Sequence, residues 1–89
     1  MDFEWDENKR EANLAKHGLD LAAGVWLFDG RPVYSYPSPR NDEHRVVTVG
    51  YLNEIAVAVI WTTRENIIRL ISMRRARDVE KRKYQTLYS

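Results

Sequence analysis

The sequence predicts an α+β domain in which an N-terminal helical hairpin precedes an antiparallel meander of about four strands and a C-terminal helix. Three observations predict this class. Helix start and stop signals bound two short segments before residue 30, β-branched runs fill residues 44–73, and a helical pattern returns over residues 76–87. A chain of 89 residues forms one domain at most, so we expect a single domain over residues 1–89.

The N-terminal hairpin is predicted from its capping residues. The first helix should run from about Glu7 to Lys16, with Asp6 as its N-cap and Gly18 at the left-handed C-terminal position. A second helix should begin after Asp20, its own N-cap, and end before Gly30. Its apolar positions, roughly three and four residues apart, are Leu21, Ala22, Val25, Trp26 and Leu27 or Phe28.

A β-hairpin is predicted at the centre of the sheet. Residues 44–52 and 55–63 are β-branched runs separated by Asn53-Glu54, which is typical of a tight turn. This turn places Val46 opposite Trp61, and the two faces of the hairpin follow from strict alternation. One face has small alanines, which would let a helix pack closely, and comprises Arg45, Val47, Val49, Tyr51, Ala56, Ala58 and Ile60.

The remaining strands and the last helix are predicted from proline and from alternation. Residues 32–36 form a short edge strand, because proline restricts pairing. Residues 66–73 are apolar on both faces, which favours an interior strand. The helix over residues 76–87 is expected to bury a stripe, and Trp26 and Trp61 are expected in the core. The stripe comprises Ala76, Val79, Lys83 and Leu87.

Charge is unevenly distributed although the net charge is only +1. Residues 1–45 carry nine acidic and six basic side chains, whereas residues 64–83 carry eight basic and three acidic ones. Such a basic segment can attract RNA or an acidic protein, or can form a solvated helix face. There is no cysteine, no signal-peptide pattern and no apolar run long enough for a bilayer, so we expect a cytoplasmic protein without membrane attachment.

The Lys16-His17 pair points to RNA cleavage without a metal or other cofactor. Attack of the ribose 2′-oxygen on phosphorus needs a base, an acid and cations around the phosphate. Imidazole transfers protons near neutral pH, and an ammonium group binds phosphate. The alternative is that His17 only stabilises the helix C-terminus. No HExxH, Walker loop or GxSxG pattern occurs, so the sequence does not support a metalloprotease, a P-loop enzyme or a serine hydrolase.

Nearly the whole chain resembles the BrnT family, the toxin half of type II BrnT–BrnA toxin–antitoxin modules. The matching positions are Phe3-x-Trp5-Asp6, Lys9, Asn13, Lys16-His17-Gly18, Arg45, Gly50-Tyr51, Ile71-Ser72-x-Arg74-Arg75-Ala76, Glu80, Arg82 and Tyr84. The resemblance implies a RelE-like fold and a ribonuclease activity that arrests growth. It also implies neutralisation by a BrnA-like antitoxin in a heterotetramer, with DNA contacted only through the antitoxin.

Residue types and the resemblance together define a predicted site. We expect His17, Arg69, Arg74 and Glu80 to be catalytic, since they supply proton-transfer groups and cations. The expected RNA- or phosphate-binding residues are Lys16, Arg45, Arg75 and Tyr84. For Arg69, an interior-strand arginine, the alternative is an ion pair with Glu80, Asp6 or another acid, and for Arg45 it is a salt bridge at the sheet edge.

Two functions remain open at this point. The first is an endoribonuclease toxin that acts through a basic pocket and inhibits translation. The second is a non-catalytic partner of a DNA-binding regulator, for which the basic C-terminal segment is only a docking surface. Growth arrest on overexpression, relieved by His17→Ala or Arg69→Ala, would favour the first, and harmless overexpression would favour the second.

Overall fold

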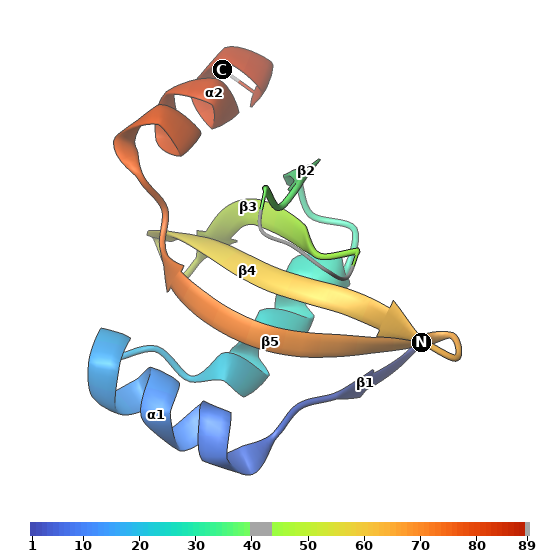
Figure 1. The fold of residues 1–89 in the computed structure, drawn as a ribbon. Helices are drawn as coiled ribbons and strands as arrows, with labels where there is room; N and C mark the ends of the chain where they lie inside the picture. The colour runs from blue at the N-terminus through green and yellow to red at the C-terminus, as the bar shows by residue number, and fades with distance from the viewer. Residues whose placement is uncertain (40–43, 89) are drawn as a thin grey trace.

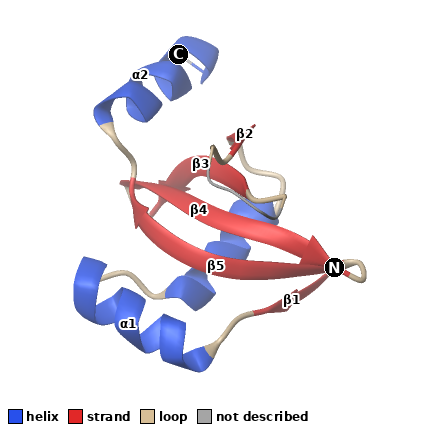
Figure 2. Cartoon of the chain, viewed as in Figure 1, coloured by secondary structure: helices blue, strands red, loops and turns tan. Residues whose placement is uncertain are grey.

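The computed structural model describes residues 1–39 and 44–88, which form an α+β domain around one mixed sheet (Figures 1 and 2). Its elements in chain order are β1 (Asp2–Glu4), α1 (Glu7–His17), the 3-10 helix η1 (Leu21–Phe28), β2 (Tyr34–Pro37), β3 (Val46–Leu52), β4 (Ile55–Arg64), β5 (Ile67–Arg75) and α2 (Asp78–Tyr88). The described residues contain no helix that is both long and apolar enough to span a bilayer. The predicted fold class is confirmed, whereas the predicted number of strands is not.

In the described residues the sheet has five strands in the order β1-β5-β4-β3-β2, rather than the predicted four. The additional strand β1 pairs in parallel with β5, with Phe3 opposite Ile68, so the sheet is mixed rather than purely antiparallel. Three residues are too few to show alternation, so no strand pattern is visible there in the sequence. β5 lies between β1 and β4, and its predicted interior position is therefore confirmed.

The central hairpin forms in the predicted register. Val46 pairs with Trp61 and Thr48 pairs with Val59. The turn residues Asn53 and Glu54 have φ values of 49° and 67°. Two consecutive residues in the left-handed region are typical of the type I′ turn, whose twist matches that of the strands it joins.

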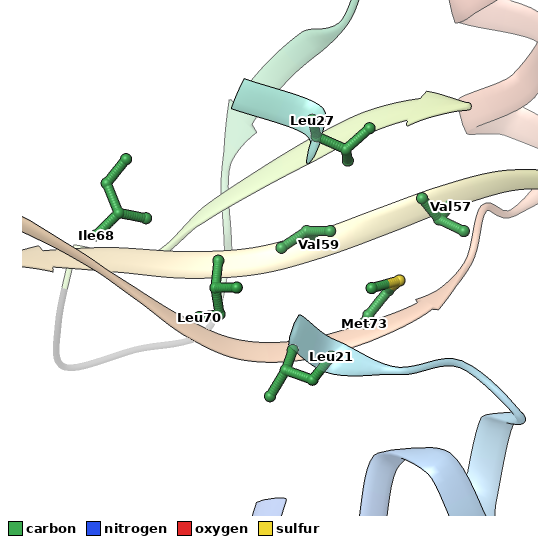
Figure 3. Packing of buried hydrophobic residues seen from close by; sticks show 7 residues of the cluster. All are labelled: Leu21, Leu27, Val57, Val59, Ile68, Leu70 and Met73. Carbon is green, nitrogen blue, oxygen red and sulfur yellow. The ribbon is translucent and has the colours of Figure 1, made fainter. Parts of the chain in front are cut away.

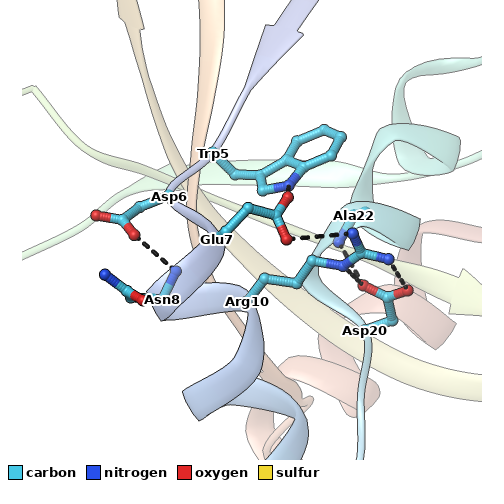
Figure 4. A network of polar contacts seen from close by, with 7 residues as sticks. All are labelled: Trp5, Asp6, Glu7, Asn8, Arg10, Asp20 and Ala22. Carbon is cyan, nitrogen blue, oxygen red and sulfur yellow. Dashed lines mark hydrogen bonds and ion pairs between the residues drawn. The ribbon is translucent and has the colours of Figure 1, made fainter.

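The N-terminal hairpin is confirmed in its caps but not in its second helix. The Asp6 side chain accepts a hydrogen bond from the backbone N–H of Asn8 at 2.8 Å, and Gly18 follows α1 with a φ of 68°. Arg10 then joins α1 to the N-cap of the next element, donating to both oxygens of Asp20 at 2.8 and 3.0 Å (Figure 4). That element is a 3-10 helix, a geometry that shares its capping and apolar signals with an α-helix.

Two apolar clusters cover the two faces of the sheet. The larger lies between the sheet and η1, and comprises Leu21, Leu27, Val57, Val59, Ile68, Leu70 and Met73 (Figure 3). The second, Val47, Val49 and Ala58, packs against Ala76 and Tyr84, so the face with small alanines does receive the C-terminal segment. Trp61 packs against the larger cluster as expected, but Trp26 is 58% exposed, and its predicted core position is wrong.

The helix α2 turns a different face to the sheet from the predicted one. Val79 and Leu87 are 61% and 52% exposed, whereas Glu80 is only 4% exposed. Tyr84 also faces inward, and its ring contacts Tyr51 with centroids 5.1 Å apart. An apolar stripe is expected to be the buried face of a helix, with glutamate in solvent. In α2 the glutamate Glu80 is buried instead, because hydrogen-bond donors around it satisfy its carboxylate.

Candidate active site

A pocket of about 390 Å³ opens between the end of α1, the face of β3–β5 that α2 covers, and the start of α2. Val47, Ile60 and Ile71, from the neighbouring strands β3, β4 and β5, contribute apolar side chains to its lining. Most of the other lining side chains are polar or basic. The remaining lining residues are Lys16, His17, Tyr36, Ser38, Pro39, Arg45, Ser72, Arg74 and Arg77.

The basic side chains reach this pocket from three separate parts of the chain. Lys16 and His17 form the last turn of α1, which Gly18 ends by leaving the helical conformation. Arg45 directly precedes β3, and Arg74 lies near the end of β5, followed by Arg77. No acidic side chain is found among the described residues that line the pocket. An anion inside it would therefore meet several positive charges in a partly enclosed space.

Arg74 is held in place by the buried carboxylate of Glu80. The two side chains form a bidentate pair, with Nη1–Oε1 and Nη2–Oε2 distances of 2.8 and 3.0 Å. Glu80 also accepts from the Tyr36 hydroxyl and, at 2.7 Å, from the backbone N–H of Arg77. These partners supply what an ionised carboxylate needs when it leaves water. The guanidinium group of Arg74 is consequently fixed at the pocket wall.

Glu80 should make the stability of the protein depend on acid. Burial alone raises the pKa of this carboxyl, but hydrogen bonds from Arg74, from the Arg77 N–H and from Tyr36 outweigh burial and lower the pKa from 4.5 to about 2. As the pH falls, the Glu80 carboxyl therefore binds a proton in the unfolded chain before it does so in the folded protein. The contribution of Glu80 to the free energy of unfolding, about 3 kcal/mol for such a shift, is complete above about pH 5 and is lost between about pH 4.5 and 2.

Urea unfolding of wild type and Glu80→Gln between pH 7 and 3 measures this dependence. The Gln variant lacks the titrating group, so its free energy of unfolding should fall less steeply with acid, and the two curves should converge at low pH. Other carboxylates, Asp20 and Asp29 among them, also have lowered pKa values, and both proteins retain them. Curves that stay parallel throughout would contradict the assignment.

The structure brings together half of the residues expected from the sequence. Lys16, His17, Arg45 and Arg74 all line the pocket. Glu80 lies directly behind it, in contact with Arg74. These residues come from positions far apart in the sequence, so their convergence depends on the fold rather than on any local motif.

Arg69, Arg75 and Tyr84 do not line this pocket. Arg69 forms an ion pair with Glu4 on β1 at 3.0 Å, which is the alternative weighed from the sequence. Arg75 is exposed at the end of β5. The Tyr84 hydroxyl donates to the backbone carbonyl of Pro32 at 3.1 Å, on another part of the surface.

Eight lining residues were not part of the site expected from the sequence, and the polar ones among them are Tyr36, Ser38, Ser72 and Arg77. Arg77 stands in the basic run that begins at Arg74, but nothing in that run indicates which arginine faces the pocket. Tyr36 alternates with Tyr34 on β2, a pattern that fits a half-buried edge strand equally well. Their roles follow only from the packing of α2 against the sheet.

A larger hollow of about 490 Å³ lies beside Asp29, Arg31 and Tyr84. The lining residue Arg31 donates to both oxygens of Asp29 at 2.9 and 2.8 Å. Those hydrogen bonds lower the pKa of Asp29 to about 2, so the charges of the pair largely cancel near neutral pH. Within residues 1–39 and 44–88, no three side chains of histidine, cysteine, aspartate or glutamate group together in a way that could hold a metal ion.

Comparison with known proteins identifies the family to which the chain belongs. No curated protein matches the chain. A family model described as the ribonuclease toxin BrnT of type II toxin–antitoxin systems matches residues 5–80, which include both the end of α1 and the Arg74–Glu80 pair. Members are ribonuclease toxins, and membership in a type II system implies an RNA target and an antitoxin partner. The chain therefore belongs to the BrnT family of ribonuclease toxins.

Proposed function

We propose that this protein is a metal-independent endoribonuclease that inhibits translation and growth and is neutralised by a cognate BrnA-like antitoxin in a heterotetramer. The observation that carries the proposal is the pocket in which His17 lies among Lys16, Arg45, Arg74 and Arg77. A proton-transfer group surrounded by cations is the equipment that cleavage by the ribose 2′-oxygen needs. We place this activity in the cytoplasm, where messenger RNA is translated.

The mechanism assigns proton transfer to His17. Its imidazole takes the proton of the 2′-hydroxyl while the 2′-oxygen forms a bond to the adjacent phosphorus. The bond from phosphorus to the 5′-oxygen then breaks, the leaving oxygen takes up the proton that His17 removed from the 2′-hydroxyl, and a 2′,3′-cyclic phosphate remains. No water or metal enters this step. His17 is only partly buried, at the end of a helix, so a phosphodiester can approach it from the pocket.

The cations are assigned to the phosphate. Negative charge on the non-bridging oxygens is greatest in the pentavalent transition state, so a fixed guanidinium stabilises this state more than the substrate. Arg74 suits that role because Glu80 orients it, which makes Glu80 a positioning residue. Lys16, Arg45 and Arg77 line the pocket around it and would hold the flanking backbone. Arg69, Arg75 and Tyr84 lie outside this scheme.

A growth assay tests the proposal. Induction of the wild-type gene alone should stop growth and fragment cellular RNA, and expression of the adjacent antitoxin gene should restore growth. Lys16→Ala, an exposed position with little effect expected on folding, should reduce toxicity. A non-catalytic partner of a DNA-binding regulator would leave growth and RNA unaffected even when the folded protein accumulates, and that result would contradict the proposal.

A further inference from the structure

Asn13 is a buried polar side chain that joins three parts of the chain. It lies in the middle of α1, is 7% exposed, and uses both ends of its amide. Its Nδ2 donates to the backbone carbonyl of Leu19 at 3.0 Å. Its Oδ1 accepts from the backbone N–H of Met73 at 2.9 Å and from the Ser72 hydroxyl at 3.2 Å. One residue thus fixes α1 to β5 and to the segment after α1.

This contact occurs in the part of β5 that lies beyond its pairing with β1. The short strand β1 pairs only with residues 67–69 of β5. Beyond Arg69, in the part of the chain that the structure describes, this edge of β5 has no strand beside it. The pairing with β4 also shifts its register at Ile60/Trp61, which indicates a bulge. Asn13 supplies an acceptor that a strand would otherwise provide, so the N–H of Met73 is satisfied although it is buried.

The two elements that this contact joins both contribute residues to the lining of the pocket. Lys16 and His17 follow Asn13 by three and four residues, so all three lie on one side of the helix. On β5, the residues that flank Met73 are Ser72 and Arg74, and both line the pocket. The Asn13 contact therefore joins the helix that carries His17 to the strand that carries Arg74.

We propose that Asn13 is a positioning residue for RNA cleavage, which acts through His17 by holding the end of α1 against β5. The inference rests on the proposed function, because it takes His17 as the proton-transfer group. Small displacements of reacting groups are costly, and about 1 Å can reduce a rate by 10²-fold. Asn13→Ala should therefore reduce kcat by about 10- to 100-fold and change KM little, since the cations that bind phosphate remain.

A double-mutant cycle tests this role. kcat and KM for cleavage of a short single-stranded RNA are measured for wild type, Asn13→Ala, His17→Ala and the double variant, at a temperature where all four are folded by circular dichroism. If Asn13 acts through His17, removing it from the His17→Ala protein should cost nothing further in kcat. Two independent, additive losses would overturn the proposal but leave the proposed function intact.

The control is Arg10→Ala, which removes another link of α1, the one to Asp20, and leaves the contact with β5 in place. It should keep kcat near that of wild type, and an equal loss in both variants would overturn a specific role for Asn13. If Asn13→Ala does not fold, Asn13→Asp takes its place, because a carboxylate keeps both acceptor bonds to β5. This variant should retain most of kcat, and loss of cleavage in a folded Asn13→Asp protein would overturn the proposal.

A different pattern would instead contradict the proposed function. If His17→Ala cleaves RNA at the wild-type rate, His17 is not the proton-transfer group, and the role of Asn13 through it falls as well. The failure of the proposed function is then visible in His17→Ala alone, whereas the role of Asn13 fails through its own variants, the Arg10→Ala control or the cycle while His17→Ala still loses cleavage.

Discussion

Replacement of His17 by alanine is expected to slow RNA cleavage by about 10²- to 10⁴-fold, the usual contribution of a positioned acid–base group. RNA affinity should change little, since Lys16, Arg45 and Arg77 remain in the pocket. The fold should also persist, because His17 lies at the helix end, where Gly18 provides the cap. Single-turnover cleavage of a labelled RNA, with binding measured separately, gives both quantities.

The matched control is His44→Ala, which removes the other histidine of the chain. His44 is exposed and lies beside Thr62 and Arg64, outside the pocket that His17 lines. Its replacement should leave cleavage close to that of wild type. If both variants cleave RNA at the wild-type rate, His17 transfers no proton in the rate-limiting step. If both lose cleavage to the same extent, the loss is a general effect of removing a histidine.

Replacement of Arg74 by alanine should have the largest effect on stability, together with a loss of cleavage. It leaves Glu80, which is 4% exposed, as a buried carboxylate without its cation. Removal of one partner of a buried ion pair typically costs about 3–5 kcal/mol. Urea unfolding at pH 7 measures the change in the free energy of unfolding, and RNA cleavage is then assayed where the variant remains folded.

Arg69→Ala is the matched control for Arg74→Ala. Both arginines lie on β5 and pair with a glutamate, but Glu4 is 33% exposed in its side chain, so its pair with Arg69 should contribute only about 0–1 kcal/mol. The double variant Arg74→Ala/Glu80→Gln separates stability from activity. Without a buried charge it should recover part of the stability, yet it should remain inactive. Cleavage restored together with stability would show that Arg74 acts only on the fold.

The fold was predictable from sequence where one simple rule decided the structure. The hairpin register followed from a two-residue turn and strict alternation, and the ends of α1 followed from Asp6 and Gly18. β1 was not predictable, because a three-residue strand has no period of its own and forms only against β5. The exposed face of α2 was mispredicted because an apolar stripe was assumed to be the buried one.

The site was predictable in part for a similar reason. Lys16 and His17 end a well-defined helix, and their residue types indicate their chemistry. The basic residues of β5 could not be distinguished in sequence, since Arg69 and Arg74 are both strand arginines with acids available elsewhere in the chain. Only the packing decides that Arg69 meets Glu4 while Arg74 is fixed by Glu80 at the pocket wall.

The central claim is that this pocket cleaves RNA by attack of the ribose 2′-oxygen. The most direct measurement is the chemistry of the product ends, with purified antitoxin-free protein, excess chelator, and an RNA that carries a single 2′-deoxy substitution at the mapped cleavage position. The mechanism predicts a 2′,3′-cyclic phosphate and a 5′-hydroxyl from the unmodified RNA, and no cleavage at the 2′-deoxy position. Products with a 5′-phosphate and a 3′-hydroxyl, or undiminished cleavage at the deoxy position, would contradict it.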